Sequence, residues 1–131
     1  MNILPANVTK ITKSDSFILL ELACGNSIFT SLVLESSESD EYTLGENVNI
    51  LFKETEVMIA TPDSKVSARN SFVCPISDIE MGVLLCNIAF DFDSYIIHAI
   101  ITKNALLELE CEKGESFRWF VKSNEVSIQK I

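Results

Sequence analysis

Short segments in which apolar and polar residues alternate recur along the whole chain. In the first half the alternation covers residues 17–22 and 48–52, and Gly, Asn or Ser bounds each segment. In the second half residues 87–92 alternate, residues 95–102 form an apolar run rich in β-branched side chains, and residues 117–121 form a further segment. A period of two residues places successive side chains on opposite faces, so these segments predict short β-strands.

One segment departs from this period. Within residues 104–112, Leu106, Leu107 and Leu109 are spaced to line one short helical turn. The strand candidates are short and turn residues separate them, a pattern typical of small closed barrels. The predicted fold class is therefore all-β.

A tandem repeat underlies the pattern. The segment Lys-Glu-Thr-Glu-Val-Met-Ile at 53–59 recurs at 122–128 as Lys-Ser-Asn-Glu-Val-Ser-Ile, with four identical positions. A Gly-Glu pair stands eight residues before each Lys, at 45–46 and at 114–115. Two matches in the same relative positions indicate that the chain contains two copies of one unit.

The rest of the two copies also aligns once one residue is removed from a loop, with Asn2 opposite Asn70. The residues Thr-Pro-Asp-Ser at 61–64 have turn chemistry that suits a linker. We therefore predict two repeats, residues 1–62 and residues 66–131, each forming a small barrel.

Composition is consistent with a folded chain outside the membrane. Of the 131 residues, 47% are hydrophobic, which is enough to build a core, and the apolar runs are short and interrupted. A membrane span needs roughly 20 apolar residues, so none is predicted. No basic segment leads into an apolar one near Met1, so no secretory signal is expected and the predicted location is cytoplasmic.

The four cysteines show neither a CxxC pair nor the spacing of a zinc site. They are Cys24, Cys74, Cys86 and Cys111. In a reducing compartment their thiols are expected to be free, and buried Cys is a common small core residue.

The net charge of the chain limits the classes of ligand that it is expected to bind. The net charge is −9, which argues against nucleic acid because phosphate binding needs a basic face. The charge is unevenly spread: residues 1–64 carry three basic and ten acidic residues, a net of −7, and residues 65–131 carry seven and nine, a net of −2. If a small anion binds, most of its cationic partners must come from the second half.

Three blocks of sequence resemble one known family. They are Ser-Ala-Arg-Asn at 67–70, Ala-Ile-Ile-Thr at 99–102 with Ala105 after it, and the Lys-Glu-Thr-Glu-Val-Met-Ile segment at 53–59. Residues 80–82, Glu-Met-Gly, also match a glycine turn between the first two strands. In this order and spacing the blocks resemble the molybdenum-pterin-binding (Mop) domain, also called the TOBE domain, over nearly the whole chain as two tandem units.

The resemblance implies a five-stranded barrel of the OB type in each repeat. Tandem copies of this family occur in small cytoplasmic oxyanion-binding proteins and in molybdate-responsive regulators, and other copies end the ATPase subunits of some importers. The chain carries neither a helix-turn-helix region nor a Walker motif. These features favour a freestanding binding protein.

The resemblance also implies which residues hold the ligand, a molybdate or tungstate oxyanion. A tetrahedral dianion has only acceptor oxygens, so its site needs hydroxyls, backbone N–H groups and cationic side chains. Ala68 would supply an N–H group, Ser123 a hydroxyl or backbone donor, and Lys53 is the matching lysine of the first repeat. The predicted oxyanion-binding residues are Ser67, Ala68, Arg69, Thr102, Lys122, Ser123 and Lys53.

The first repeat departs from the family pattern. Only Met1 precedes Asn2, and Leu34 stands where the second repeat has Thr102, with Ser36 and Ser37 nearby as substitutes. In the second repeat Ala105 stands where the family often has Ser, so that any role there falls to its N–H group. The number of intact sites is left open. Sites in this family form where repeats or subunits meet, which implies a homo-oligomer.

Several residues have simpler interpretations. Arg69 could instead pair with the acidic first half, and the lysines could be solvated strand residues. His98 has no partner at metal-ligand spacing and is expected to be a packed or surface residue. Trp119 is expected to be buried rather than to stack on bases. The acidic run is expected to be a solvated loop: Glu35, Glu38, Asp40 and Glu41.

Two functions remain. The first is a cytoplasmic binding protein for molybdate or tungstate, in storage, homeostasis or sensing, without catalysis. The second is an interaction module that docks a transporter ATPase or a regulator without binding anion. No nucleophile–base pair or phosphate-binding glycine loop supports an enzyme. The sequence does not separate molybdate from tungstate.

Overall fold

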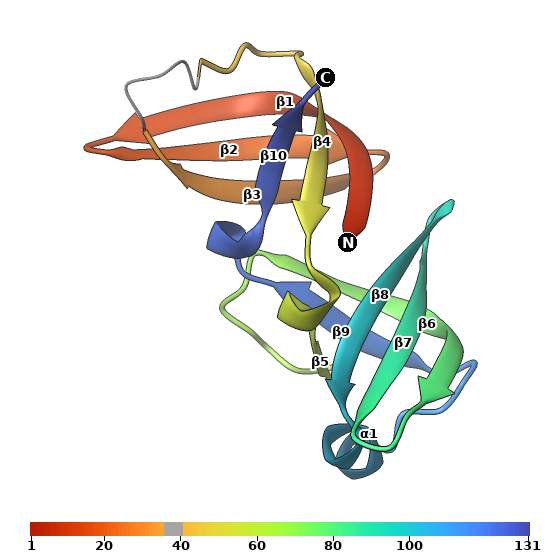
Figure 1. Ribbon diagram of the computed structural model, residues 1–131. Coiled ribbons are helices and arrows are strands. Elements are labelled where there is room, and N and C mark those ends of the chain that lie inside the picture. The colour runs from red at the N-terminus through yellow and green to blue at the C-terminus, as the bar shows by residue number, and fades with distance from the viewer. Residues whose placement is uncertain (36–40) are drawn as a thin grey trace.

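The computed structural model describes residues 1–35 and 41–131, and its strands form two five-stranded, strongly curled sheets (Figure 1). The first sheet has the order β10-β4-β1-β2-β3 and the second β5-β9-β6-β7-β8. The predicted all-β class with two OB-like barrels is confirmed. The strands of the first sheet are β1 (Asn2–Ser14), β2 (Phe17–Cys24), β3 (Ser27–Leu34), β4 (Asn47–Phe52) and β10 (Ser127–Lys130). Those of the second are β5 (Met58–Ala60), β6 (Asn70–Met81), β7 (Leu85–Phe92), β8 (Tyr95–Thr102) and β9 (Ser116–Val121).

Each sheet takes its fifth strand from the other half of the chain. β10, the last strand, pairs with β4, and β5 crosses in the opposite direction to pair with β9 (Figure 1). Two short 3-10 turns, η1 (Glu54–Glu56) and η2 (Ser123–Glu125), carry the chain across. The two repeated Lys-containing segments therefore lie at the crossing points between the sheets.

Alternating burial explains why these residues form strands. Along β2, Ile18, Leu20 and Leu22 are fully buried while the residues between them are exposed or half-buried. Burying one such side chain completely contributes about 1.5–3 kcal/mol. The one α-helix of the described residues, α1 (Lys103–Leu109), overlaps the segment 104–112 that was predicted to contain a helical turn, and it buries Leu106.

The repeated Gly-Glu pair has a structural cause. Gly45 and Gly114 have positive φ values of 85° and 91°, a conformation that glycine adopts without strain. Each donates its N–H to the first long strand of its sheet, Gly45 to Val8 O at 2.7 Å and Gly114 to Ile76 O at 2.9 Å. Each Gly-Glu pair thus immediately precedes a strand that pairs with this long strand: β4 pairs with β1, and β9 pairs with β6.

An aromatic cluster joins the two sheets. Phe29 and Phe52 come from the first sheet, and Phe72, Phe92 and Trp119 from the second. Ring centroids lie 5.0 Å apart for Phe29 and Phe72 and 5.9 Å apart for Phe52 and Trp119. Trp119 is completely buried, so the expectation that it is a core residue is confirmed.

The four cysteines are buried and free, as expected. Burial raises the pKa of the Cys24 and Cys74 thiols, and raises the pKa of Cys111 to about 11. These thiols therefore stay protonated at neutral pH. In the part of the chain that the structure describes, no helix is long and apolar enough to cross a membrane.

Candidate anion-binding site

Two of the predicted donor segments leave adjacent strands at the same edge of the second sheet. Asn70, the first residue of β6, is the register partner of Val121, the last residue of β9. Arg69 precedes β6 and Lys122 follows β9, so the segments 67–69 and 122–123 leave these neighbouring strands at the same edge of the sheet. Ser67, Arg69 and Lys122 are exposed, and Ala68 and Ser123 are half-buried. The two segments hold five of the seven predicted residues.

Asn70 fixes this edge to the first sheet. Its side chain is completely buried, accepts the N–H of Thr30 at 2.7 Å and donates to the carbonyl of Thr30 at 2.9 Å. The Thr30 hydroxyl is also hydrogen-bonded to the Ser123 hydroxyl. Thr30 therefore contacts both segments that flank the candidate site.

An equivalent clamp joins the two sheets in the opposite direction. Asn2 donates to the carbonyl of His98 at 2.9 Å and accepts its N–H at 2.9 Å. The His98 ring is a packed residue as expected, with Nδ1 3.0 Å from the Asn87 side-chain oxygen. The aligned pair Asn2 and Asn70 thus has one structural role in both repeats.

The positive charges of the second edge have no ion-pair partner among the described residues. Within residues 1–35 and 41–131, neither Arg69 nor Lys122 has a carboxylate at ion-pair distance. The interdomain ion pair considered for Arg69 is therefore absent from this part of the chain. Two cations that are held in no ion pair with these residues favour the approach of an anion.

A further arginine holds the segment that leads into the site. Arg118 on β9 donates to the Ser71 hydroxyl at 2.9 Å and to the Pro62 carbonyl at 2.8 Å. The turn predicted at 61–64 is present, with the N–H of Ser64 donated to Thr61 O at 3.1 Å. Arg118 therefore anchors the chain shortly before the donors begin.

The strand edge of the first repeat that corresponds to this candidate site differs from it in charge. Lys53 is exposed at the end of β4 and shares a cleft of about 280 Å³ with the carboxylates of Glu56 and Glu125. Glu54 stands where the second repeat has Ser123, and its carboxylate is paired with the Met1 ammonium. Carboxylates near Lys53 oppose the binding of a dianion.

Thr102 lies apart from the edge that carries Arg69 and Lys122. It ends β8 at the N-terminus of α1, which Figure 1 places far from η2, and it lines a cleft with Thr55 of η1. Its hydroxyl oxygen accepts the N–H of Ala105 at 3.1 Å, so this N–H is engaged. Its counterpart Leu34 is 65% exposed and cannot donate. Four residues considered from the sequence lie outside the described residues: Ser36, Ser37, Glu38 and Asp40.

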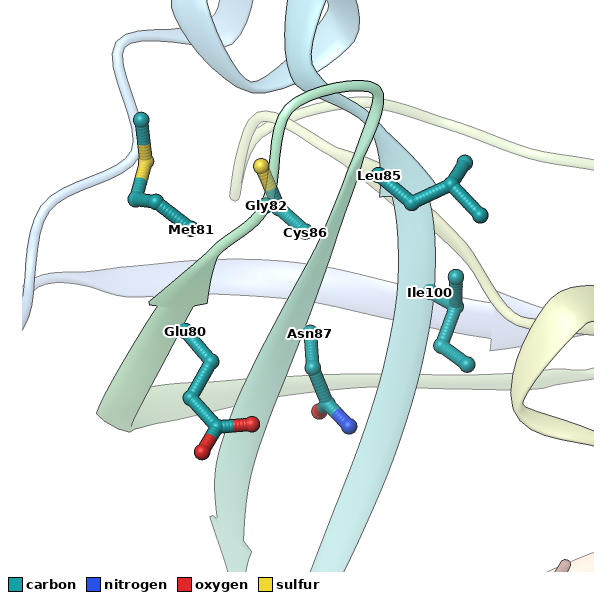
Figure 2. Close-up of a pocket in the computed structure, with 7 residues that line it drawn as sticks. All are labelled: Glu80, Met81, Gly82, Leu85, Cys86, Asn87 and Ile100. Carbon is teal, nitrogen blue, oxygen red and sulfur yellow. The ribbon is translucent and has the colours of Figure 1, made fainter.

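Figure 2 shows a different cleft, of about 450 Å³, on the β6–β7 hairpin and β8. It contains a carboxylate and no cationic side chain, so it does not suit an oxyanion. Gly82 is required in its turn, since a Cβ there would lie 2.5 Å from Leu85 O. The lining residues are Glu80, Met81, Gly82, Leu85, Cys86, Asn87 and Ile100.

Sequence reasoning missed Thr30 and Arg118. Thr30 follows an ordinary alternating pattern, and its contact with Ser123 spans 93 residues. No sequence motif around Arg118 indicates that its guanidinium contacts Pro62, 56 residues away. The alignment of Asn2 with Asn70 was the one available signal for the clamp, because two isolated polar residues shared the start of equivalent strands.

Solved structures with the same fold match this chain, and one of them matches over nearly its full length. It is the crystal structure of the cytoplasmic molybdate-binding protein ModG with molybdate bound, which superposes with a TM-score of 0.92. The two chains are 21% identical, and the match covers 99% of this chain and 96% of that chain. No protein-family model and no curated protein matches the sequence. At this identity the comparison establishes a shared fold.

Proposed function

We propose that the chain is a cytoplasmic binding protein for molybdate or tungstate, which acts in storage, homeostasis or sensing without catalysis. One observation carries the proposal: the segments with Ser67 and Arg69 and with Lys122 and Ser123 leave one strand edge, and neither cation forms an ion pair within residues 1–35 and 41–131. The fold shared with ModG, which binds molybdate, supports it.

The donors suit a tetrahedral dianion. The Arg69 guanidinium offers a planar set of N–H groups, and Lys122 offers a compact charge. Ser67, Ser123 and the N–H of Ala68 add neutral donors from other directions. A hydrogen bond to a charged group contributes about 1.5–3 kcal/mol, so a few of them compensate the loss of water around the anion.

We further propose that a homo-oligomer completes the site. Thr102 does not reach Arg69 within one chain, but both are exposed, so Thr102 of one copy can meet the donor edge of another. Lys53 would add charge at such a junction. The β6–β7 hairpin exposes Val83 by 89% and Leu84 by 77%, apolar surface that association would cover. Sedimentation of the protein with and without molybdate tests this step.

The alternative is an interaction module that docks a transporter ATPase or regulator without binding anion. The same exposed Val83 and Leu84 favour it, together with the carboxylates that line the first-repeat counterpart. A stoichiometric protein partner, recovered from a chain that takes up no anion, would support this function. The net charge of −9 argues against nucleic acid as a partner.

Calorimetric titration tests the main function. We expect saturable binding of molybdate and tungstate by the wild-type protein, weaker binding by Lys122→Ala, and no comparable heat with sulfate. Absence of binding by the wild-type protein at micromolar anion would overturn the proposal. Equal binding by the wild type and Lys122→Ala would show that the anion does not bind at this edge.

A further inference from the structure

Thr30 belongs to the first sheet, yet it contacts both segments of the proposed site in the second. We propose that its hydroxyl is a positioning group: it donates to Ser123 Oγ and thereby directs the Ser123 O–H toward the bound oxyanion. The inference rests on the proposed function, because it assigns Ser123 as a direct donor to the anion.

The main-chain N–H and the carbonyl of Thr30 are both fixed by hydrogen bonds. Asn70 accepts its N–H at 2.7 Å and donates to its carbonyl at 2.9 Å, and the Asn70 side chain is fully buried. A β-branched side chain on a fixed backbone has few rotamers. The Thr30 hydroxyl is therefore kept against Ser123, where the two oxygens are hydrogen-bonded.

The chemistry of the ligand sets the direction of this hydrogen bond. A hydroxyl has one hydrogen to donate and two lone pairs to accept. An oxyanion only accepts, so Ser123 must use its hydrogen for the anion. Its remaining contact with Thr30 then requires Thr30 to donate. The order is Thr30 to Ser123 to anion, and each bond in such a chain polarises the next.

The first repeat shows that the fold does not require this pair. His98 occupies the position of Thr30 and is clamped by Asn2 in the same way. Its ring, however, is hydrogen-bonded to Asn87, and Glu54 at the position of Ser123 is paired with the Met1 ammonium. The backbone clamp is common to both repeats, while the hydroxyl pair is present only beside Arg69 and Lys122.

Molybdate titration of four variants tests the proposal. Thr30→Val removes only the hydroxyl and should weaken binding about fivefold, whereas Thr30→Ser should stay within about twofold of wild type. Ser123→Ala should weaken binding about tenfold. The double variant Thr30→Val/Ser123→Ala should bind no more weakly than Ser123→Ala, because Thr30 acts through Ser123.

Thr9→Val is the matched control. It removes a hydroxyl that donates to the Glu21 carbonyl at 3.1 Å on β1, away from the donor edge, and should leave affinity unchanged. If Thr30→Val does not fold, Thr30→Ala replaces it with the same expectation. Wild-type affinity in Thr30→Val, or independent losses that multiply in the double variant, would overturn the role of Thr30 alone. A flat wild-type titration would overturn the proposed function and this inference with it.

Discussion

The two strand edges that the repeat makes equivalent share their framework and differ in their chemistry. In each, a buried asparagine at the start of the first long strand clamps the main chain of a strand in the other sheet, Asn2 on His98 and Asn70 on Thr30. The exposed residues around the clamp differ between the two edges. A repeat of this kind can therefore change its ligand chemistry while the residues that maintain its fold stay the same.

Charge is the clearest difference. At the second-repeat edge Arg69 and Lys122 have no carboxylate partner in the described part of the chain. At the first-repeat edge, Lys53 is followed by Glu54 where the second-repeat edge has Ser123, whereas Glu56 and Glu125 stand at equivalent positions of both edges. A dianion is attracted to the two cations of the second-repeat edge, whereas the first-repeat edge has the added carboxylate of Glu54 and no arginine. We therefore expect one oxyanion per chain, held at the second-repeat edge.

The largest effect is expected for Arg69→Ala. Loss of two charge-assisted hydrogen bonds should weaken molybdate binding about 100-fold in a calorimetric titration. Arg69→Lys should recover part of the loss, because it keeps the charge without the planar fork. Lys113→Ala, an exposed lysine in the loop before β9, is the matched control. Unchanged affinity in Arg69→Ala would contradict the placement of the site.

Replacement of the two clamp asparagines distinguishes their contribution to stability from their contribution to anion binding. Asn70→Ala and Asn2→Ala each leave a main-chain N–H and carbonyl without their partner, so each should lower the free energy of unfolding by about 2 kcal/mol. Only Asn70→Ala should also weaken molybdate binding, because it frees residues 67–69. Urea unfolding and titration of both variants measure the two effects. Equal losses of affinity would mean that both edges bind the anion.

The two lysines test the charge difference directly. Lys122→Ala should weaken molybdate binding about tenfold, and Lys53→Ala less than threefold, since carboxylates near Lys53 already offset its charge. Titrations at two salt concentrations should show a steeper salt dependence for the wild type than for Lys122→Ala. The opposite ranking of the two variants would move the site to the first repeat.

The smallest effect is expected for Glu54→Ser, which gives the first-repeat edge the residue found at the second. Removal of one carboxylate beside Lys53 should permit a weak second binding event. Its dissociation constant should stay at least about 100 times that of the first, because Leu34 and the missing arginine are unchanged. Two equal binding events per chain in the wild-type protein would contradict the asymmetry.

Much of the fold could be predicted from periodicity. The segments with period two are strands, the Leu-rich segment overlaps α1, and the Gly-Glu pairs mark equivalent turns. The exchange of β5 and β10 could not be predicted. The two Lys-containing segments are so similar that either pairing buries the same pattern, with Val57 and Val126 inward. Only the path of the whole chain decides between them.

The donor edge could be predicted only in part. The resemblance named the segment at 67–69 and Lys122 with Ser123, and the β6–β9 register explains why they meet. It did not indicate that Thr102 lies elsewhere or that Thr30 joins the edge. Such contacts depend on how one barrel sits on the other, and a hydroxyl pair leaves no periodic trace in a sequence.

The central claim is that one oxyanion binds at the edge formed by Arg69 and Lys122. Crystals grown with molybdate and measured at the molybdenum absorption edge would locate the metal without reference to any variant. We predict one strong anomalous peak per chain beside the Arg69 guanidinium and the Lys122 ammonium. A peak beside Lys53 and Glu54 in their place, or no peak at saturating molybdate, would contradict the account.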